Sequence, residues 1–149
     1  MKKCTLALGC FWKPEENFKN KPGITQTEVG YAGGKSPNVG YEEVCSGSTG
    51  HAEVVRLTYD EKVISFKKIL DLFFKMHDPT QKDMQYPDMG TQYRSEIFYE
   101  NEKQKKEAFE VLEEFNKKLG GKIQTNISKL KNYCKAEEYH QKYIEKNKL

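Results

Sequence analysis

The chain has 149 residues, a length that fits one domain burying roughly 70% of the surface that its unfolded form exposes. With 36% hydrophobic and 32% charged residues the composition is that of a globular protein, so folding does not require a metal or a disulfide. The 25 basic residues nearly balance the 22 acidic ones, and lysines alternate with glutamates in the C-terminal half, which is typical of solvated helix faces and not of a nucleic-acid-binding protein.

The sequence indicates no targeting segment and no membrane span. The apolar stretch from Cys4 to Leu8 is too short for a signal peptide, and no apolar run is long enough to cross a bilayer. We therefore expect a cytoplasmic protein that does not bind a membrane. In that reducing compartment the four cysteines, Cys4, Cys10, Cys45 and Cys134, are not expected to form structural disulfides.

The first part of the chain predicts strands and one helix. An apolar run over Thr5–Leu8 predicts a strand that breaks at Gly9, and a helix is expected over Phe11–Lys19. Alternating residues predict two further strands, over Ile24–Tyr31 and His51–Tyr59. Both of these strands are expected in one sheet.

The second part predicts two longer helices separated by a loop. Helical spacing of apolar residues predicts a helix over Ser65–Met76 with the serine as its cap, and a second amphipathic helix is expected over Asn101–Leu119. Short strands are expected over Ser95–Tyr99 and Ile123–Ile127. The loop His77–Gln92 is longer than ordinary connections, and such loops usually carry function.

This order of elements predicts an α+β fold. We expect a two-layer α/β sandwich with a ferredoxin-like mixed sheet and helices packed on it. Because no linker divides the chain, a single catalytic domain is expected over residues 1–149.

The first candidate reactive group is the thiol of Cys10, where the first strand ends and the first helix begins. Unpaired N–H groups and the dipole at a helix start lower the pKa of a thiol from about 8.5 and favour the thiolate. On position alone, a small buried hydrophobic cysteine remains an alternative. The adjacent Phe11 and Trp12 could be core residues, yet an aromatic wall also suits a methyl or sulfur-bearing group.

Three further clusters carry polar groups. Glu53, at the end of Gly50-His51-Ala52-Glu53, shares a predicted strand face with apolar residues, and a buried glutamate has a raised pKa and can hold a proton at neutral pH. A solvent-exposed glutamate on an edge strand explains this segment about equally well. The long loop contributes Asp88 and Tyr93, and the fourth cluster begins at Tyr41, so that two tyrosine hydroxyls are candidate donors.

Taken together, these segments resemble the A-type peptide methionine sulfoxide reductase family over nearly the whole chain. One short motif would be a weak signal, but here the motifs occur in family order and at family spacing. The matching segments are Gly9-Cys10-Phe11-Trp12 with Glu15, Gly30-Tyr31-Ala32-Gly33-Gly34, Val44-Cys45-Ser46-Gly47 with Thr49-Gly50-His51-Ala52-Glu53, His77-Asp78-Pro79, Gly90-Thr91-Gln92-Tyr93-Arg94-Ser95 and Ala136-Glu137-Glu138-Tyr139-His140-Gln141.

The resemblance implies a role for seven side chains. They are Cys10 as the nucleophile, Phe11 and Trp12 as the pocket for the substrate methyl, Glu53 as the proton donor, Tyr41 and Tyr93 as donors to the sulfoxide oxygen, and Asp88 as a residue that organises the site through water. The implied reaction is reduction of methionine S-sulfoxide, free or in proteins, with a sulfenic acid on Cys10 as intermediate and protein repair as its purpose. No cofactor and no metal are expected, thioredoxin or glutaredoxin is expected as the reductant, and the protein is expected to be a monomer.

The thiol that reduces the sulfenic acid is left open by the sequence. Many family members carry resolving cysteines in a glycine-rich tail, whereas here no cysteine follows Cys134 and no such tail precedes the final Leu149. Cys134 is equally consistent with a relocated resolving residue and with a half-exposed bystander. Cys45 and Cys4 are expected to be packing residues, and if none of these resolves Cys10, an outside thiol must.

Three other functions compete with this interpretation. A metal site of Cys10, Cys45 and His51 matches no familiar zinc spacing. A noncatalytic module that binds methyl or thioether groups would not need a thiol at a helix start. An acyl-transfer enzyme with His51 or His140 as its base lacks a recognisable orienting Asp or Asn.

Overall fold

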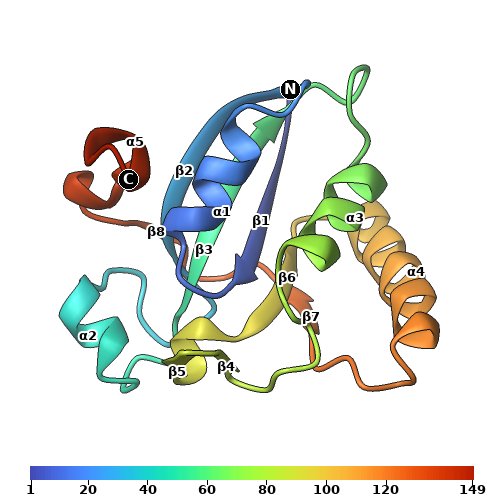
Figure 1. The fold of residues 1–149 in the computed structure, drawn as a ribbon. Coiled ribbons are helices and arrows are strands. Elements are labelled where there is room, and N and C mark those ends of the chain that lie inside the picture. The colour runs from blue at the N-terminus through green and yellow to red at the C-terminus, as the bar shows by residue number, and fades with distance from the viewer.

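The computed structural model describes residues 1–149, and its centre is a six-stranded sheet (Figure 1). The strands lie side by side in the order β7-β6-β1-β3-β2-β8. Their bounds are β1 (Lys2–Leu8), β2 (Ile24–Ala32), β3 (Ala52–Tyr59), β6 (Ser95–Tyr99), β7 (Asn126–Lys129) and β8 (Cys134–Lys135). Neighbouring strands are antiparallel except β6 and β7, which are parallel, so the sheet is mixed.

Three helices cover one face of this sheet (Figure 1). They are α1 (Trp12–Lys19), α3 (Phe66–Met76) and α4 (Glu102–Lys118). Alternate strand residues such as Leu6, Val55 and Leu57 join side chains of all three helices in one core of 22 buried residues. The predicted α+β fold, a mixed sheet with helices packed on it, is confirmed.

The opposite face of the sheet has a smaller core. Five buried side chains, among them Ala52, Val54 and Phe98, are covered there by Leu130 and Tyr133 from the segment that connects β7 to β8. Small residues on this face allow the connecting chain to cross close to the strands. This crossing brings β8 to the outer edge of β2.

Side chains that cap helices fix where α3 and α4 begin. The Ser65 hydroxyl accepts the Lys68 N–H at 3.0 Å, and the Asn101 side chain accepts the Gln104 N–H at 2.9 Å. Gly120 follows α4 with a positive φ, a conformation that glycine adopts without steric cost. The predicted ends of both helices are confirmed to within one residue.

The last predicted strand begins later than expected. We expected it over Ile123–Ile127, but β7 spans Asn126–Lys129. The Ile123 N–H donates to the Asn116 side chain and the Gln124 N–H to the Pro79 carbonyl, so these residues bond to a helix end and a loop instead of to β6.

Several short elements were not predicted. The long loop contains β4 (Met84–Gln85), β5 (Asp88–Met89) and η1 (Thr91–Tyr93), with β4 and β5 paired as a small ribbon. Elsewhere the structure adds α2 (Tyr41–Cys45), β8, η2 (Glu138–His140) and α5 (Tyr143–Lys146). Each has five residues or fewer, which is too short for hydrophobic periodicity to show.

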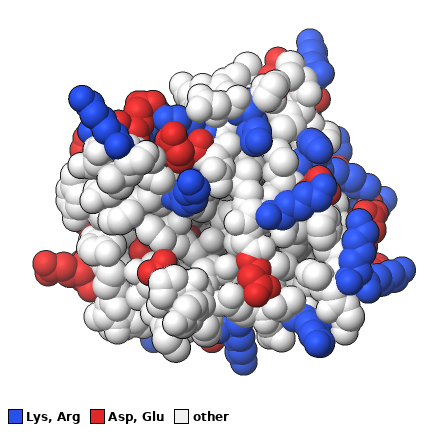
Figure 2. All heavy atoms as spheres, in the orientation of Figure 1, with Lys and Arg blue, Asp and Glu red and all other residues white.

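The surface has mixed charge. Basic and acidic side chains are interspersed over the face seen in Figure 2, without a stripe of one sign. None of the helices combines the length and the apolar character needed to cross a membrane.

Candidate active site

The site forms around Cys10, in the turn between β1 and α1. Gly9 turns the chain with a φ of +98°, and α1 begins at Trp12, so the thiol lies just before the first turn of the helix. The side chain of Cys10 is half-buried. The predicted position, between a strand and a helix, is therefore confirmed.

The predicted effect of the helix on the thiol is outweighed by burial. Burial raises the pKa of Cys10 to about 12, and the backbone N–H of Trp12 acts in the opposite direction without balancing it. The proximity of Glu53, Asp88 and Cys45 raises this pKa further. The expectation of a lowered pKa is wrong for the substrate-free protein, in which Cys10 is a neutral thiol at neutral pH.

Glu53 lies on β3, a central strand between β1 and β2, and only 1% of its surface is exposed. Its Oε1 accepts the backbone N–H of Phe11, the residue after the candidate nucleophile, at 3.2 Å. Burial raises the pKa of Glu53 to about 8; the Phe11 N–H lowers it and the Asp88 charge raises it. The alternative of an exposed glutamate on an edge strand is wrong, because Glu53 is buried on a central strand, and the direction of its pKa agrees with the predicted protonated acid.

Two tyrosines and an aspartate complete the polar group. Tyr41 starts α2, Tyr93 ends η1 and Asp88 starts β5. The pKa of Tyr41 is raised by its contact with Cys45, by burial and by Glu53, and that of Tyr93 by burial and then by Glu53. Both hydroxyls therefore keep their protons at neutral pH and can donate them in hydrogen bonds. The Asp88 charge acts on Tyr93 as well as on Cys10 and Glu53, so all these groups are close together.

The two predicted aromatic residues differ in their surroundings. Phe11 is fully buried, with ring centroids 5.7 Å from Tyr31 and 5.1 Å from His140. Trp12 is partly exposed and stacks on Tyr143, with centroids 3.7 Å apart and ring planes 6° from parallel. Trp12 thus offers an accessible apolar surface beside the thiol, whereas Phe11 supports it from the core.

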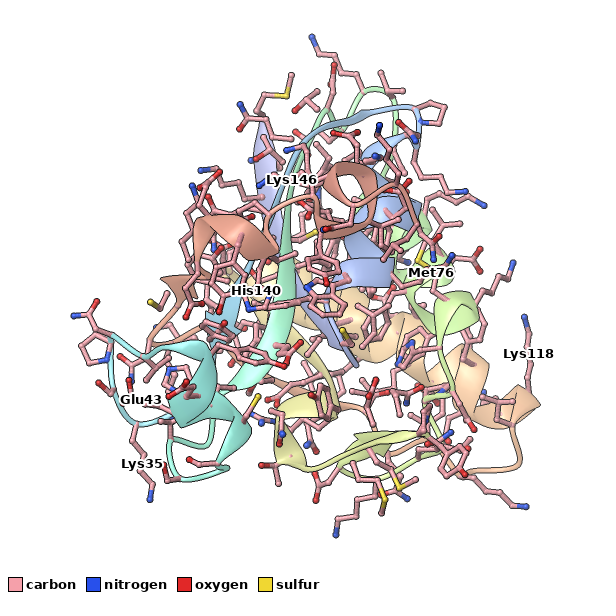
Figure 3. All side chains as sticks on the ribbon, turned by 60° about the vertical axis from the view of Figure 1, so that its left-hand side comes forward. Lys35, Glu43, Met76, Lys118, His140 and Lys146 are labelled. Atoms are coloured by element: carbon pink, nitrogen blue, oxygen red, sulfur yellow. The ribbon has the colours of Figure 1, made fainter.

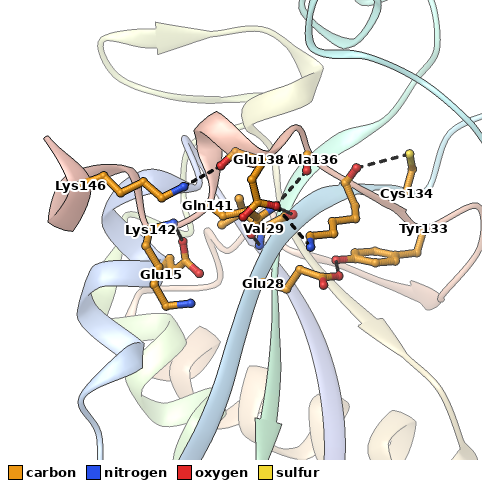
Figure 4. Close-up of polar contacts among 11 residues, drawn as sticks. Glu15, Glu28, Val29, Tyr133, Cys134, Ala136, Glu138, Gln141, Lys142 and Lys146 are labelled. Atoms are coloured by element: carbon orange, nitrogen blue, oxygen red, sulfur yellow. Dashed lines mark hydrogen bonds and ion pairs between the residues drawn. The ribbon is translucent and has the colours of Figure 1, made fainter.

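The segment after β8 is bound to the site by side chains for which the sequence had suggested no role. Both carboxylate oxygens of Glu137 are used, one by the Tyr31 hydroxyl at 2.7 Å and the other by the Tyr41 N–H at 2.9 Å. The buried Glu15 accepts the Lys142 N–H (Figure 4) and the Thr27 hydroxyl. The only sequence signal for these contacts was that Glu15, Tyr31 and Glu137 fall within the matching motifs.

Gln141 extends the hydrogen bonding of β2. Its side-chain amide accepts the Val29 N–H and donates to the Val29 carbonyl, both at 2.9 Å (Figure 4). A second bond from the same amide reaches the Ala136 carbonyl at 3.0 Å. The Val29 carbonyl also accepts the Ala136 N–H at 3.0 Å, so a backbone group and a side chain together continue the edge of the sheet at Val29.

The other cysteines are placed differently. Cys134 is on the outer strand β8, in register with Tyr31, and its sulfur lies 3.6 Å from the Val39 carbonyl oxygen. Cys45 ends α2, and it is one of the neighbours that raise the pKa of Cys10. Cys4 is fully buried in the core, as expected. Of the cysteines, Cys45 and not Cys134 is thus the one that influences Cys10.

The alternative sites considered from the sequence do not form in the structure. No group of three or more His, Cys, Asp or Glu side chains, including Cys10, Cys45 and His51, is arranged to hold a metal ion. The imidazole of His51 contacts the Asn132 carbonyl oxygen, and that of His140 accepts a bond from Trp12. No hydrogen bond joins either histidine to Cys10, so neither is placed as its base.

Comparisons with known proteins agree with this geometry. The family model described as peptide methionine sulfoxide reductase matches residues 2–149. The peptide methionine sulfoxide reductase MsrA of Pelagibacter ubique is 56% identical over 146 residues, covering 98% of this chain and 99% of that protein. Reduced Mxr1 of Saccharomyces cerevisiae is 44% identical with a TM-score of 0.94, over 99% of this chain and 86% of the yeast one. Mxr1 in complex with Trx2 is 32% identical with a TM-score of 0.68, over 95% and 84% of the two chains. The chain therefore belongs to the peptide methionine sulfoxide reductase family.

Proposed function

We propose that this enzyme reduces the S epimer of methionine sulfoxide, free or in proteins, with Cys10 as the nucleophile and Glu53 as the proton donor. The observation that carries the proposal is the bond from the Phe11 N–H to Glu53, because it joins a buried, protonated acid to the residue beside the thiol. Sulfoxide reduction needs a nucleophile and an acid close together. Here one hydrogen bond links the acid to the residue that follows the nucleophile.

The protonation states suggest the order of events. A sulfoxide sulfur becomes electrophilic when its oxygen is protonated, and Glu53, with a pKa of about 8, holds that proton at neutral pH. Cys10 also keeps its proton before substrate binds. Once Glu53 has given its proton to the oxygen, its carboxylate can accept the proton of Cys10 as the thiol sulfur attacks.

The atoms and protons of this step balance. The Cys10 sulfur bonds to the substrate sulfur; the hydroxyl then moves to Cys10 as both the sulfur–oxygen bond and the new sulfur–sulfur bond break, which leaves a sulfenic acid and releases methionine. Glu53 regains the proton that Cys10 loses, so the acid is ready for another cycle. The net reaction of this step converts a thiol and a sulfoxide into a sulfenic acid and a thioether.

The neighbouring residues would serve the substrate. Tyr41 and Tyr93, protonated at neutral pH, would donate to the sulfoxide oxygen, and Asp88 would orient water beside it. The partly exposed ring of Trp12 would receive the substrate methyl, with Phe11 behind it.

A second thiol must then reduce the sulfenic acid by way of a disulfide. Because the yeast relative Mxr1 has been captured with Trx2, we propose thioredoxin as the final reductant, with glutaredoxin as the alternative. The first thiol to reach Cys10 is either Cys134 or one supplied from outside. We also propose that the enzyme works as a monomer in the cytoplasm, where thiols are kept reduced.

The test is turnover of a peptide carrying methionine S-sulfoxide, with dithiothreitol, a thioredoxin system or a glutaredoxin system. Wild type, Cys10→Ser and Cys134→Ser are compared, and the R epimer is the substrate control. We expect Cys10→Ser to abolish turnover with every reductant, and the R epimer to be left unreduced.

The outcomes separate the possibilities. Absence of wild-type turnover with all three reductants would contradict the proposal. Full activity of Cys134→Ser with each reductant would show that Cys134 is not the thiol that reduces Cys10. Loss of its activity with thioredoxin alone would identify Cys134 as the resolving residue.

A further inference from the structure

The short helix α2 carries Tyr41, one of the two tyrosines whose hydroxyl would hold the sulfoxide oxygen. In Figure 3 this helix, labelled at Glu43, lies beside the segment after β8, which carries His140. The ring centroids of Tyr41 and His140 are 4.7 Å apart, so the two segments are in contact. The position of the Tyr41 hydroxyl therefore depends on how α2 is fixed against this segment.

The helix α2 is too short to hold itself in place. It has five residues, whereas an isolated helix needs roughly 12–15 residues to be stable in water. The residue before it is Gly40, which has no side chain to accept the free N–H groups of the first turn. Its start must therefore be bound by a group from elsewhere in the chain.

Glu137 supplies the acceptor that Gly40 lacks. Its Oε2 accepts the Tyr41 N–H at 2.9 Å, across 96 residues of sequence. Its Oε1 accepts the hydroxyl of Tyr31 at 2.7 Å. Tyr31 is fully buried on β2, and the register of β2 and β3 places it opposite Glu53. One carboxylate thus joins the first residue of α2 to the strand beside the proposed acid.

The carboxylate of Glu137 is itself held in place. The residues before it pair with β2 as β8, and the Ala136 N–H donates to the Val29 carbonyl at 3.0 Å. Burial raises the pKa of Glu137, but hydrogen bonds from backbone N–H groups, chiefly that of Tyr41, and from the Tyr31 hydroxyl hold it below its ordinary value. At neutral pH the group is therefore a carboxylate, which can accept both bonds at once.

The hydroxyl end of Tyr41 reaches the site. It contacts Cys45, one turn further along α2, and this contact is the largest cause of the raised pKa of Tyr41, followed by burial. Glu53 and Cys10 also act on this pKa, so both are close to the hydroxyl. Moving the start of α2 would therefore move the hydroxyl relative to the nucleophile and the acid.

We propose that Glu137 is a positioning residue that fixes the start of α2 and so holds the Tyr41 hydroxyl near Cys10 and Glu53. The kinetic part of this inference rests on the proposed function, whereas the placement of α2 does not. The sulfoxide oxygen draws electron density from its bond to sulfur as Cys10 attacks, so a hydrogen bond to it is stronger in the transition state than in bound substrate. Loss of Glu137 should therefore slow the chemical step more than it weakens substrate binding.

Substitutions at three positions test this role. Glu137→Leu removes both acceptors, whereas Glu137→Gln keeps an oxygen for the Tyr41 N–H and has an NH₂ group that can donate to the Tyr31 hydroxyl. Tyr41→Phe removes the hydroxyl that is to be positioned, alone and together with Glu137→Leu. Glu138→Leu is the matched control, because the Glu138 side chain is 78% exposed and pairs with Lys135 at 3.6 Å.

The rate of methionine formation is measured in single turnovers of a methionine S-sulfoxide peptide without added reductant, so that reduction of the sulfenic acid does not limit it. We expect the maximal rate to fall about tenfold in Glu137→Leu, with the half-saturating peptide concentration changed by less than about twofold. Glu137→Gln and Glu138→Leu should stay within about twofold of the wild-type rate. Because Tyr41→Phe already lacks the hydroxyl, adding Glu137→Leu to it should slow the reaction no further.

Hydrogen exchange of the Tyr41 amide, followed by NMR, tests the placement of α2 without substrate. This N–H loses its acceptor in Glu137→Leu, so its exchange should become about tenfold faster. In Glu137→Gln and Glu138→Leu the exchange should stay near the wild-type rate. If wild type shows no reductase activity, the proposed function fails, while the exchange data still test whether Glu137 fixes α2.

The inference is overturned if folded Glu137→Leu, checked by circular dichroism, keeps the wild-type rate and amide exchange. It is equally overturned if Glu137→Leu slows Tyr41→Phe as much as it slows wild type, because Glu137 then does not act through the Tyr41 hydroxyl. If Glu137→Leu fails to fold, Glu137→Asp replaces it, since its carboxylate is one methylene shorter and cannot span both partners. The same two criteria then decide.

Discussion

Replacing Glu53 by glutamine should stabilise the folded protein, and the gain should grow as the pH rises. Glutamine keeps an oxygen to accept the Phe11 N–H at the position of Oε1, but it carries no charge. The folded protein holds the proton of Glu53 until a pKa of about 8, whereas the ordinary value is 4.5. At about 1.4 kcal/mol per pKa unit, ionising Glu53 in the folded protein costs of the order of 5 kcal/mol.

The direction of the pH dependence follows from proton binding. Between pH 4.5 and 8 the folded wild type binds more protons than the unfolded chain, so its stability falls as the pH rises. Below 4.5 both states are protonated, and the difference between wild type and Glu53→Gln is constant. Between pH 6 and pH 8 the advantage of Glu53→Gln in unfolding free energy should therefore increase by about 2–3 kcal/mol.

Urea denaturation followed by circular dichroism at pH 5, 6, 7 and 8 measures this difference. The control is Glu113→Gln, on α4, where the side chain is 73% exposed and its charge is solvated. We expect the control to track wild type at every pH. A constant difference between Glu53→Gln and wild type across this range would show that Glu53 is already ionised in the folded protein, and the argument for it as proton donor would be refuted.

Three further predictions concern the acid, the C-terminal segment and a helix cap. In single turnovers without an added reductant, the rate at which methionine forms should fall about tenfold per pH unit above 8, as Glu53 loses its proton; a flat profile would contradict its role. Gln141→Leu leaves the Val29 N–H unpaired, while the Val29 carbonyl keeps the Ala136 N–H, and should lower the unfolding free energy by about 1–3 kcal/mol, against little change in the exposed control Gln26→Leu; an equal effect in both would refute this account. Ser65→Ala should cost about 1 kcal/mol in urea denaturation, and no loss would mean that the cap contributes nothing.

The sheet and the main helices could be predicted from local patterns. Alternation over β2 and β3 and helical spacing over α3 and α4 reflect the face that each element turns toward the main core, although β3 is also buried on its other face. The same alternation placed Glu53 beside Val55 and Leu57, which is why its burial could be foreseen as one alternative. Whether Glu53 is buried or exposed depends on the position of β3 in the sheet. β3 is central because it pairs with both β1 and β2, and the sequence does not show this pairing.

The ionisation of Cys10 could not be read from neighbouring residues. A helix start is visible in the sequence and does lower the pKa of the thiol, but the larger effect is burial. That burial depends on long-range packing, which places Glu53, Asp88 and Cys45 close enough to Cys10 for their charges to act on it.

The C-terminal segment could not be predicted for a different reason. Its residues bind through single polar side chains, as Gln141 binds Val29 across 112 positions, and Glu137 binds Tyr31 across 106. Such contacts leave no periodic trace in the sequence.

The hydrogen bond between Trp12 and His140 also has a consequence during synthesis. The reactive thiol is made long before the segment that completes its surroundings, because 128 positions separate Trp12 from His140. On the ribosome, Cys10 and Trp12 must wait for this segment to leave the exit tunnel, and until then no pocket can form around them. The emerging chain is thus open to oxidants until the segment that contains Gln141 folds back onto β2.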